Sequence, residues 1–187
     1  LVRGNHETRG NMAREYARYV PKSSGKYYGA YRVGDIMFVV LDCGEDKPDD
    51  FWVYAGLTDF DGYRTEQAAW FGELIRSKAY KSAKWRIVMN HFPPLSHMEG
   101  DNPERHGIQD ITDKFLPLYN QAKIDLMISG HTHAYEFMSP DKYDRLTFPV
   151  IVNSTESVAR IDIDGRTLKA KVTDTGGNTL KEFTISK

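Results

Sequence analysis

Apolar residues along the chain fall into short, nearly continuous runs, a pattern typical of strands buried inside an α/β domain. Residues 27–33 and 36–41, separated by Gly34 and Asp35, predict a β-hairpin whose second strand is central because it is almost entirely apolar. Further runs predict strands at residues 85–90, 126–128, 150–153, 159–163, 168–173 and 180–185. A hairpin turn is predicted at residues 164–165, and the alternating run at 180–185 predicts an edge strand.

Apolar positions at helical spacing predict three helices that cover the sheet. The first spans residues 11–20 and ends at Pro21. The second begins with Thr65 as its N-cap and continues to about residue 77. The third begins at Asp110, and Pro117 leaves open two short segments in place of one helix.

Residues 45–62 form a long connection rich in Asp and Gly that also carries Phe51, Trp52, Tyr54 and Phe60. Connections of this length are usually functional or mobile, so a loop that faces a substrate is one interpretation. The other is that its aromatic rings pack back on the core, and the sequence favours neither.

Residues 1–3 have the pattern of the last part of a strand that runs into Gly4. A strand normally needs about five residues, and no initiator methionine precedes this one. We therefore expect residues 1–187 to be the C-terminal portion of a single domain whose preceding strand and helix units lie upstream.

Composition narrows the class of protein. The chain has 187 residues, of which 40% are hydrophobic, and this is enough for one domain with a sizeable core. Its net charge is −1 with 27% charged residues, so no overall electrostatic field favours binding to nucleic acid or to an anionic membrane. A local basic binding site stays open. No apolar run is long enough to span a membrane, and the lone Cys43 excludes an internal disulfide.

Nitrogen and oxygen donors follow three of the predicted strands. They lie in the segments Gly4-Asn5-His6-Glu7, Asn90-His91 and Gly130-His131-Thr132-His133. Parallel strands bring their carboxyl ends to one edge of a sheet, and an extended turn would direct the last two histidines to the same face. Neutral imidazoles and an amide oxygen suit Zn, Fe or Mn, whereas the absence of a cysteine cluster argues against a structural zinc site. Asp42 also ends a strand, but a turn residue that accepts local backbone hydrogen bonds is the favoured interpretation.

In this order the three motifs resemble the last three of the five blocks of calcineurin-like metallophosphoesterases. The segments His91-Phe92-Pro93-Pro94, His97-Met98-Glu99-Gly100 followed by Arg105, and Gly130-His131-Thr132-His133-Ala134-Tyr135-Glu136 resemble the purple acid phosphatase branch. The first seven residues also resemble the signature of Ser/Thr protein phosphatases. That group carries His-Gly-Gly where this chain has His-Phe-Pro, which argues against it.

The resemblance implies a fold and residue roles. The fold is a four-layer α/β/β/α sandwich with mixed sheets, here lacking its N-terminal βα units. The implied metal ligands are Asn5, His91 and His131 for one ion and His133 for its neighbour, the two ions being Fe, Zn or Mn. In such a centre a bridging hydroxide attacks phosphorus in line.

The same resemblance implies that His6 contacts the phosphate or protonates the leaving oxygen, and that His97 is a second phosphate contact. Glu7 is expected to support the turn. Arg105 and His106 are expected at the surface.

The first two blocks of the family pattern, which would supply an Asp, a His and a bridging carboxylate, are absent from this sequence. The parent is therefore expected to be a dinuclear phosphoester hydrolase. The isolated chain is expected to be inactive, to hold at most one ion weakly, or to be completed by another chain. An uncovered sheet edge predicts self-association.

Two alternatives stay open: a phosphodiesterase or nuclease of the same fold, and a non-catalytic module that has lost half of its metal site. A phosphoester substrate is expected, and the mixed charge argues against a nucleic-acid or membrane partner. The resemblance favours a secreted or periplasmic location, on which the residues themselves are silent.

Overall fold

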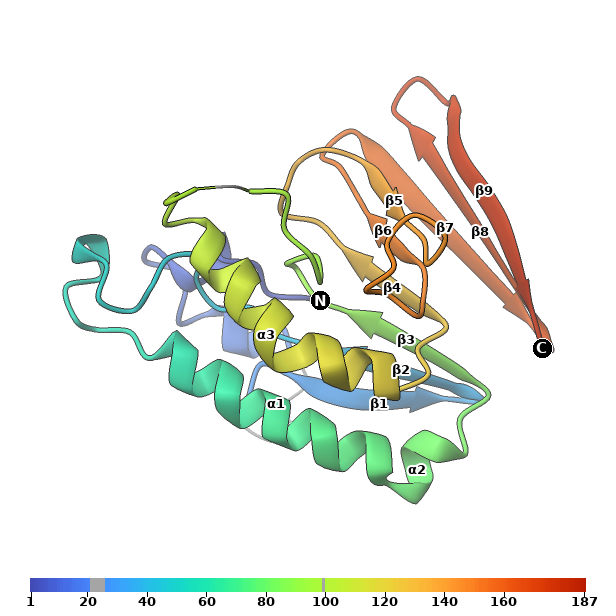
Figure 1. The fold of residues 1–187 in the computed structure, drawn as a ribbon, viewed down its shortest axis with the longest axis horizontal. Helices are drawn as coiled ribbons and strands as arrows, with labels where there is room; N and C mark the ends of the chain where they lie inside the picture. The colour runs from blue at the N-terminus through green and yellow to red at the C-terminus, as the bar shows by residue number, and fades with distance from the viewer. Residues whose placement is uncertain (21–25, 99) are drawn as a thin grey trace.

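The computed structural model describes residues 1–20, 26–98 and 100–187. Within them a six-stranded mixed sheet forms the centre of the molecule (Figure 1). Its strands are β1 (Gly29–Val33), β2 (Ile36–Val40), β3 (Trp85–Met89), β4 (Leu126–Ser129), β5 (Glu136–Met138) and β6 (Val150–Val152). The strand order is β1-β2-β3-β4-β6-β5, with the four inner strands parallel and both edge strands antiparallel. The apolar runs therefore predicted the inner strands correctly, but β5 was missed.

A second sheet packs on one face of the first. It is an antiparallel meander of β7 (Ser157–Asp164), β8 (Thr167–Asp174) and β9 (Thr179–Ser186). Trp85 and Leu126 of the first sheet meet Leu168 and Val172 of the second in a buried apolar layer. The three strands predicted in this region are confirmed, as is the hairpin turn at Gly165, where φ is +54°.

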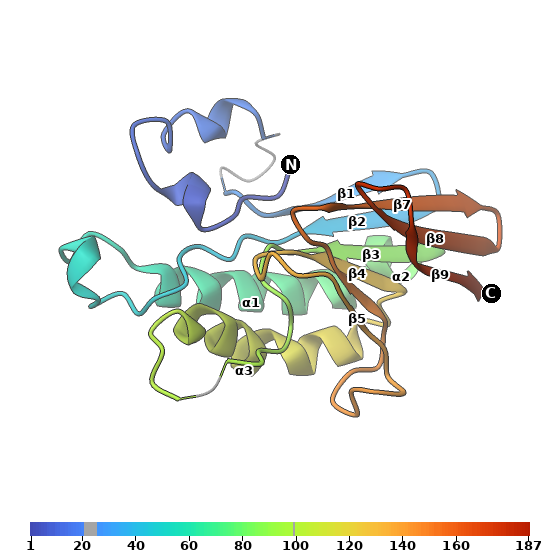
Figure 2. The ribbon, with the colours of Figure 1, turned by 90° about the horizontal axis from the view of Figure 1, so that it is seen from above.

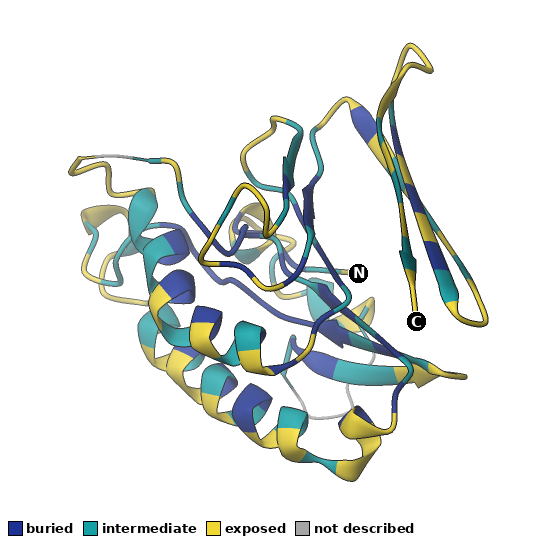
Figure 3. Cartoon of the chain, turned by 45° about the vertical axis from the view of Figure 1, so that its right-hand side comes forward, coloured by how far each residue is buried: buried dark blue, intermediate teal, exposed yellow. Residues whose placement is uncertain are grey.

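Helices cover the other face of the central sheet. They are α1 (Phe60–Arg76), α2 (Lys78–Lys81) and α3 (Arg105–Gln121), and α1 and α3 run side by side (Figure 2). Phe71 of α1 and Phe115 of α3 pack with Val39 and Met127 of the sheet in the main core. Burial is concentrated where the layers face each other (Figure 3). The described residues thus form three layers, α/β/β, of the expected sandwich, and none of their helices is long and apolar enough to cross a membrane.

The predicted start of the second helix was wrong by several residues. The helix begins at Phe60, and the Asp59 carboxylate accepts a hydrogen bond from the Gly62 backbone nitrogen at 3.2 Å. Thr65 lies inside the helix, where its hydroxyl donates to the Asp61 carbonyl at 2.9 Å. Gly62 in the first turn made the sequence predict a later start for this helix, because glycine has a poor helix propensity.

The third helix also begins earlier than predicted, at Arg105 instead of Asp110, and it continues through Pro117 without a break. Two short segments are therefore excluded. Pro117 lies on the exposed side of the helix. There, the carbonyl that loses its hydrogen-bond donor can bind water instead.

The first twenty residues contain no long helix and no strand. Residues 11–20 form turns and the short 3-10 helix η2 (Tyr16–Arg18), because their backbone hydrogen bonds, such as Ala13 to Gly10, span three residues. The predicted helix was wrong, and Pro21 lies outside the described residues. Residues 1–3 pair with no strand, so the strand expected there is not formed.

Two helical glycines offer a matched test of the packing between the layers. A Cβ on Gly107 of α3 would lie 2.6 Å from the Glu45 carbonyl oxygen and 2.9 Å from the Asp46 Cα. A Cβ on Gly72 of α1 would meet nothing closer than 3.7 Å. We expect Gly107→Ala to lower the free energy of unfolding by about 1–3 kcal/mol, since backbone cannot yield. Gly72→Ala should raise it by about 0.5–1 kcal/mol. Urea denaturation checks both, and a stabilised Gly107→Ala variant would contradict this packing.

Candidate functional site

The turns predicted to carry metal ligands line one cleft of about 610 Å³. Asn5 comes from the N-terminal segment, His91 follows β3, and His131 and His133 follow β4. The two strand ends are joined by a hydrogen bond of 2.9 Å from the Gly130 nitrogen to the His91 carbonyl oxygen. Parallel pairing of β3 and β4 therefore sets the histidines at the same edge of the sheet.

Asn5 is held rigidly at the bottom of this cleft. The residue is only 2% exposed, and its Oδ1 lies 3.2 Å from His91 Nε2. Its Nδ2 donates to Asp46 Oδ2 at 3.0 Å, which fixes the orientation of the amide. The Asn5 oxygen thus faces the imidazole of His91.

Gly4, directly before Asn5, packs closely against Glu7 and His91. The Gly4 nitrogen donates to Glu7 Oε2 at 2.8 Å, and a Cβ on Gly4 would lie 3.0 Å from the His91 ring. Glu7 therefore supports the turn in this structure, which is the role expected for it. It also lines the cleft.

His131 and His133 have backbone φ angles of +71° and +60°. The turn is not extended, because both residues lie in the left-handed region, so the condition under which both side chains would leave the same face is not met. Such angles are uncommon for residues other than glycine, and they are concentrated at functional sites. The His131 ring approaches the His91 ring edge-on, with 5.2 Å between centroids.

Burial sets the charge state of the two inner imidazoles. Burial, with the neighbouring His91 and His133 acting in the same direction, lowers the pKa of His131 to about 4. Burial also lowers the pKa of His91, against the opposing charge of Glu7. Both rings are therefore neutral at pH 7, which is the form that binds a metal ion.

Asp46 is a cleft residue that the sequence did not identify. Its carboxylate is buried against Asn5, and it also accepts a hydrogen bond from Lys47 Nζ at 2.9 Å. Its position shortly after the central strand β2 was the feature of the sequence that could have identified Asp46. Asp42, the other acidic residue there, binds Arg3 through two hydrogen bonds and accepts from the Gly44 nitrogen at 3.3 Å. Only the Gly44 contact is the local backbone bond expected of a turn residue, whereas the contacts with Arg3 come from a distant segment of the chain.

The donor set fits part of a metal site. An amide oxygen and two neutral imidazoles are donors that Zn, Fe and Mn accept. In residues 1–20, 26–98 and 100–187, however, no three His, Cys, Asp or Glu side chains are placed to hold an ion together. Asn5, His91 and His131 therefore form an incomplete metal-coordination shell.

The remaining predicted residues lie at different distances from this cleft. His6 lines it, whereas His97 lines a neighbouring cavity and places Nε2 3.0 Å from Glu136 Oε1. His106 is half-buried and binds Asp61 at 2.8 Å. Arg105 is also half-buried, and its guanidinium donates to Gln109 Oε1 at 3.3 Å. Neither of the last two lines the cleft.

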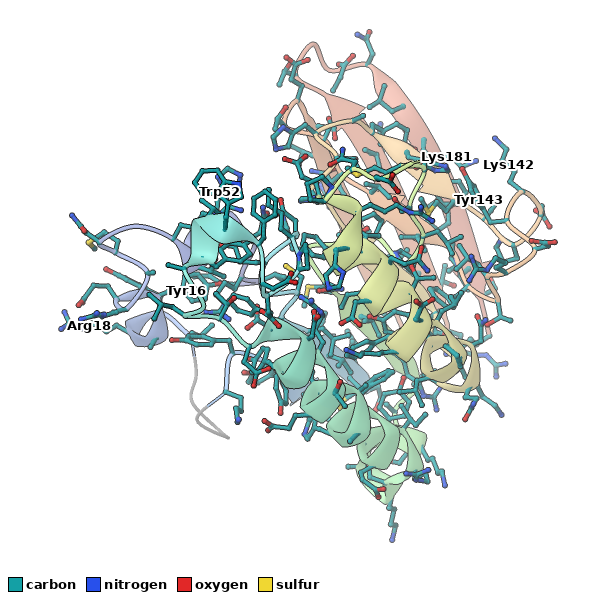
Figure 4. All side chains as sticks on the ribbon, turned by 60° about the vertical axis from the view of Figure 1, so that its left-hand side comes forward. Tyr16, Arg18, Trp52, Lys142, Tyr143 and Lys181 are labelled. Atoms are coloured by element: carbon teal, nitrogen blue, oxygen red, sulfur yellow. The ribbon has the colours of Figure 1, made fainter. Side chains whose placement is uncertain are left out.

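The loop at residues 45–62 borders the cleft. Arg9 and Lys47 line the cleft and also a smaller cavity formed by Phe51, Trp52, Val53 and Tyr54. Trp52 is 81% exposed and projects outward from η3 (Trp52–Tyr54), as Figure 4 shows. Its ring therefore does not pack back on the core, and a substrate-facing loop stays a prediction.

Comparison with known proteins identifies the family. A model described as calcineurin-like phosphoesterase matches residues 1–135, which is more than half of the chain. The chain belongs to the calcineurin-like phosphoesterase family. Its relatives assign it to the purple acid phosphatase-like branch, as the motifs had indicated.

Among these relatives is "Probable purple acid phosphatase 20" of Arabidopsis thaliana, 29% identical over 134 residues, which cover 70% of this chain and 28% of that protein. "Uncharacterized protein Rv2577" of Mycobacterium tuberculosis (strain ATCC 25618 / H37Rv) is 28% identical over 151 residues, 73% of this chain and 27% of that protein. The chain thus spans little more than a quarter of their lengths.

A solved structure supports the fold. The purple acid phosphatase PPD1 from yellow lupin (Lupinus luteus) seeds matches with a TM-score of 0.55 and 15% sequence identity. The match covers 89% of this chain and 34% of that structure. The mixed α/β arrangement is therefore the metallophosphoesterase fold expected from the sequence.

Proposed function

We propose that the chain is the C-terminal portion of one metallophosphoesterase domain, and that the complete domain is a metal-dependent phosphoester hydrolase. The observation that carries the proposal is the convergence of Asn5, His91 and His131 in one cleft of a calcineurin-like phosphoesterase. The relatives named as purple acid phosphatases favour a phosphomonoester substrate over a diester.

Asn5, His91 and His131 would hold one ion of Zn, Fe or Mn, and His133 would hold its neighbour. Ions bound there supply Lewis-acid stabilisation of phosphate charge for an in-line displacement. Asn5 is already oriented by Asp46, and burial keeps the two imidazoles neutral, so these donors need little reorganisation. Preorganised donors of this kind favour metal affinity.

His6 has a separate role in the proposal. It follows the rigid Asn5, is exposed, and lines the cleft. An imidazole in this position can bind a phosphate oxygen or give a proton to the leaving alcohol oxygen. His97, which lines the neighbouring cavity, is the second candidate for a phosphate contact.

The incomplete shell leads to a prediction about the isolated chain. The proposed ligands are mostly neutral, and among the described residues no three His, Cys, Asp or Glu side chains are placed to hold an ion together. We therefore expect the chain to bind at most one Zn²⁺ or Mn²⁺ ion, weakly, and to be inactive. Isothermal titration calorimetry measures the stoichiometry and the affinity. His131→Ala should remove the remaining binding, whereas His106→Asn should leave it unchanged because His106 binds Asp61 outside the cleft.

Tight binding of two ions by the chain alone would contradict the incomplete shell. A polypeptide that also contains the residues preceding Leu1 tests the activity. We expect it to hydrolyse 4-nitrophenyl phosphate faster than bis(4-nitrophenyl) phosphate when loaded with metal. The reverse preference would favour the phosphodiesterase alternative, and no hydrolysis of either ester would favour the non-catalytic module.

A further inference from the structure

A second cavity of about 540 Å³ lies beside the cleft, on the side of the β4–β5 turn. Its floor is apolar and built from residues of the core: Leu95, Ile108 and Met138 are 8%, 1% and 1% exposed. The rest of its lining consists of Pro93, Ser96, His97, Met98, Thr132, Ala134, Tyr135 and Glu136. Its volume is in the range of cavities that bind small organic ligands.

The cavity is continuous with the cleft of the proposed metal site. Met98 and Thr132 line both spaces, and Thr132 stands in the chain between His131 and His133. A molecule that places its phosphate among the histidines can therefore extend its other end over Thr132 into the second cavity. That end is the alcohol from which the phosphoryl group would be removed.

The rim of the cavity carries one fixed polar cluster. His97 Nε2 lies 3.0 and 3.1 Å from the two Glu136 carboxylate oxygens, and the Tyr143 hydroxyl donates to the same carboxylate. Both Glu136 carboxylate oxygens are therefore engaged by partners within the chain. The floor offers only aliphatic and thioether groups, so a polyol inserted there would leave hydroxyl groups unpaired.

We propose that this cavity receives the alcohol part of the phosphoester and that this part is apolar or aromatic, not a sugar or glycerol. The proposal rests on the proposed phosphoesterase function, because that function places the phosphate in the adjoining cleft. Burying an aryl or alkyl group on the floor formed by Leu95, Ile108 and Met138 supplies the affinity. Met98 and Thr132, which line both spaces, then stand at the junction between alcohol and phosphate.

The free alcohol tests the cavity without metal, phosphate or turnover. We would titrate this chain, labelled at its methionine methyl groups, with 1-naphthol and follow the six methionine signals by NMR. The signals of Met98 and Met138 should shift, because both residues line the cavity. Those of Met12, Met37, Met89 and Met127 should not, and glycerol at the same concentration should shift none.

Ala134 is exposed at the cavity wall, which makes it a suitable site for blocking the space. Ala134→Trp should weaken naphthol binding at least about tenfold, whereas Ala134→Ser should bind as the natural chain does. Unchanged signals of the core residues Met37 and Met127 would show that both variants are folded.

Absence of shifts at Met98 and Met138, equal shifts with glycerol, or unchanged binding by Ala134→Trp would overturn the proposal. Failure of the extended polypeptide to hydrolyse esters while naphthol still binds would overturn the phosphoesterase function instead. The two failures are therefore distinguishable.

Discussion

Arg64→Ala is expected to lower the free energy of unfolding by about 3–5 kcal/mol, the largest loss of stability that we predict. The Arg64 side chain is completely buried in α1. Its Nε donates to Asp110 Oδ2 of α3 at 2.5 Å, and its Nη1 donates to the carbonyls of Cys43 and Glu45 at 2.9 and 3.1 Å. Removing the guanidinium leaves the partly buried Asp110 carboxylate and two buried backbone carbonyls without this hydrogen-bond donor.

The same helix provides the control. Arg76 is largely exposed and pairs with Glu73 three residues earlier, so Arg76→Ala should change stability by less than about 0.5 kcal/mol. Arg64→Lys should recover only part of the loss, because an ammonium group cannot reproduce three differently directed contacts. Urea denaturation of the three variants provides the comparison. A loss below about 1 kcal/mol for Arg64→Ala would show that this buried network contributes little to the packing of α1 and α3 against the loop that follows β2.

Most strands, although not β5, were predictable because their apolar pattern is local to the sequence. In β6, Val150 and Val152 pack toward the helices while Ile151 packs toward the second sheet. A strand buried on both faces reads as a continuous apolar run, and no other element needs to be known. In β8 alternate residues, such as Leu168 and Ala170, face the first sheet, which gives the period of two.

Helix starts were harder to predict because distant residues help to cap them. The Asp49 carboxylate accepts hydrogen bonds from the Phe60 and Asp61 nitrogens at 2.7 and 2.9 Å. Asp49 lies in the preceding loop, too far along the chain for a capping pattern to reveal it. Likewise, Gly107 belongs to α3 because its nitrogen donates to the Asp46 carbonyl at 2.7 Å, a contact that the fold creates.

In the candidate site, too, some residues could be predicted from the sequence and others could not. His91 and His131 were identifiable because they directly follow apolar strands, and the strand order decides that their turns meet. Asp46 was missed because its importance comes from its contact with Asn5, forty-one positions earlier in the chain. The left-handed angles of His131 and His133 were equally invisible, since the residue types do not demand them.

In a polypeptide that includes the residues preceding Leu1, His6→Asn is expected to lower kcat by about 10²–10⁴-fold, the range for losing a general acid. His6 stands at the start of η1 (His6–Thr8), directly after the immobilised Asn5. Its side chain is exposed in the cleft and forms no part of the proposed ligand set. Asparagine keeps a polar side chain that can contact phosphate, but it cannot transfer a proton at neutral pH.

Because His6 acts on the substrate in this proposal, the variant should keep its metal content and its stability while kcat falls. Metal analysis, urea denaturation and steady-state kinetics with an alkyl phosphate, whose leaving alkoxide needs a proton, separate these properties. His106→Asn is the matched control, since its imidazole is engaged by Asp61 away from the cleft and its kcat should be unchanged. An equal loss of kcat and bound metal in His6→Asn would instead make His6 a ligand, and a kcat within a factor of about ten of the natural protein would remove it from proton transfer.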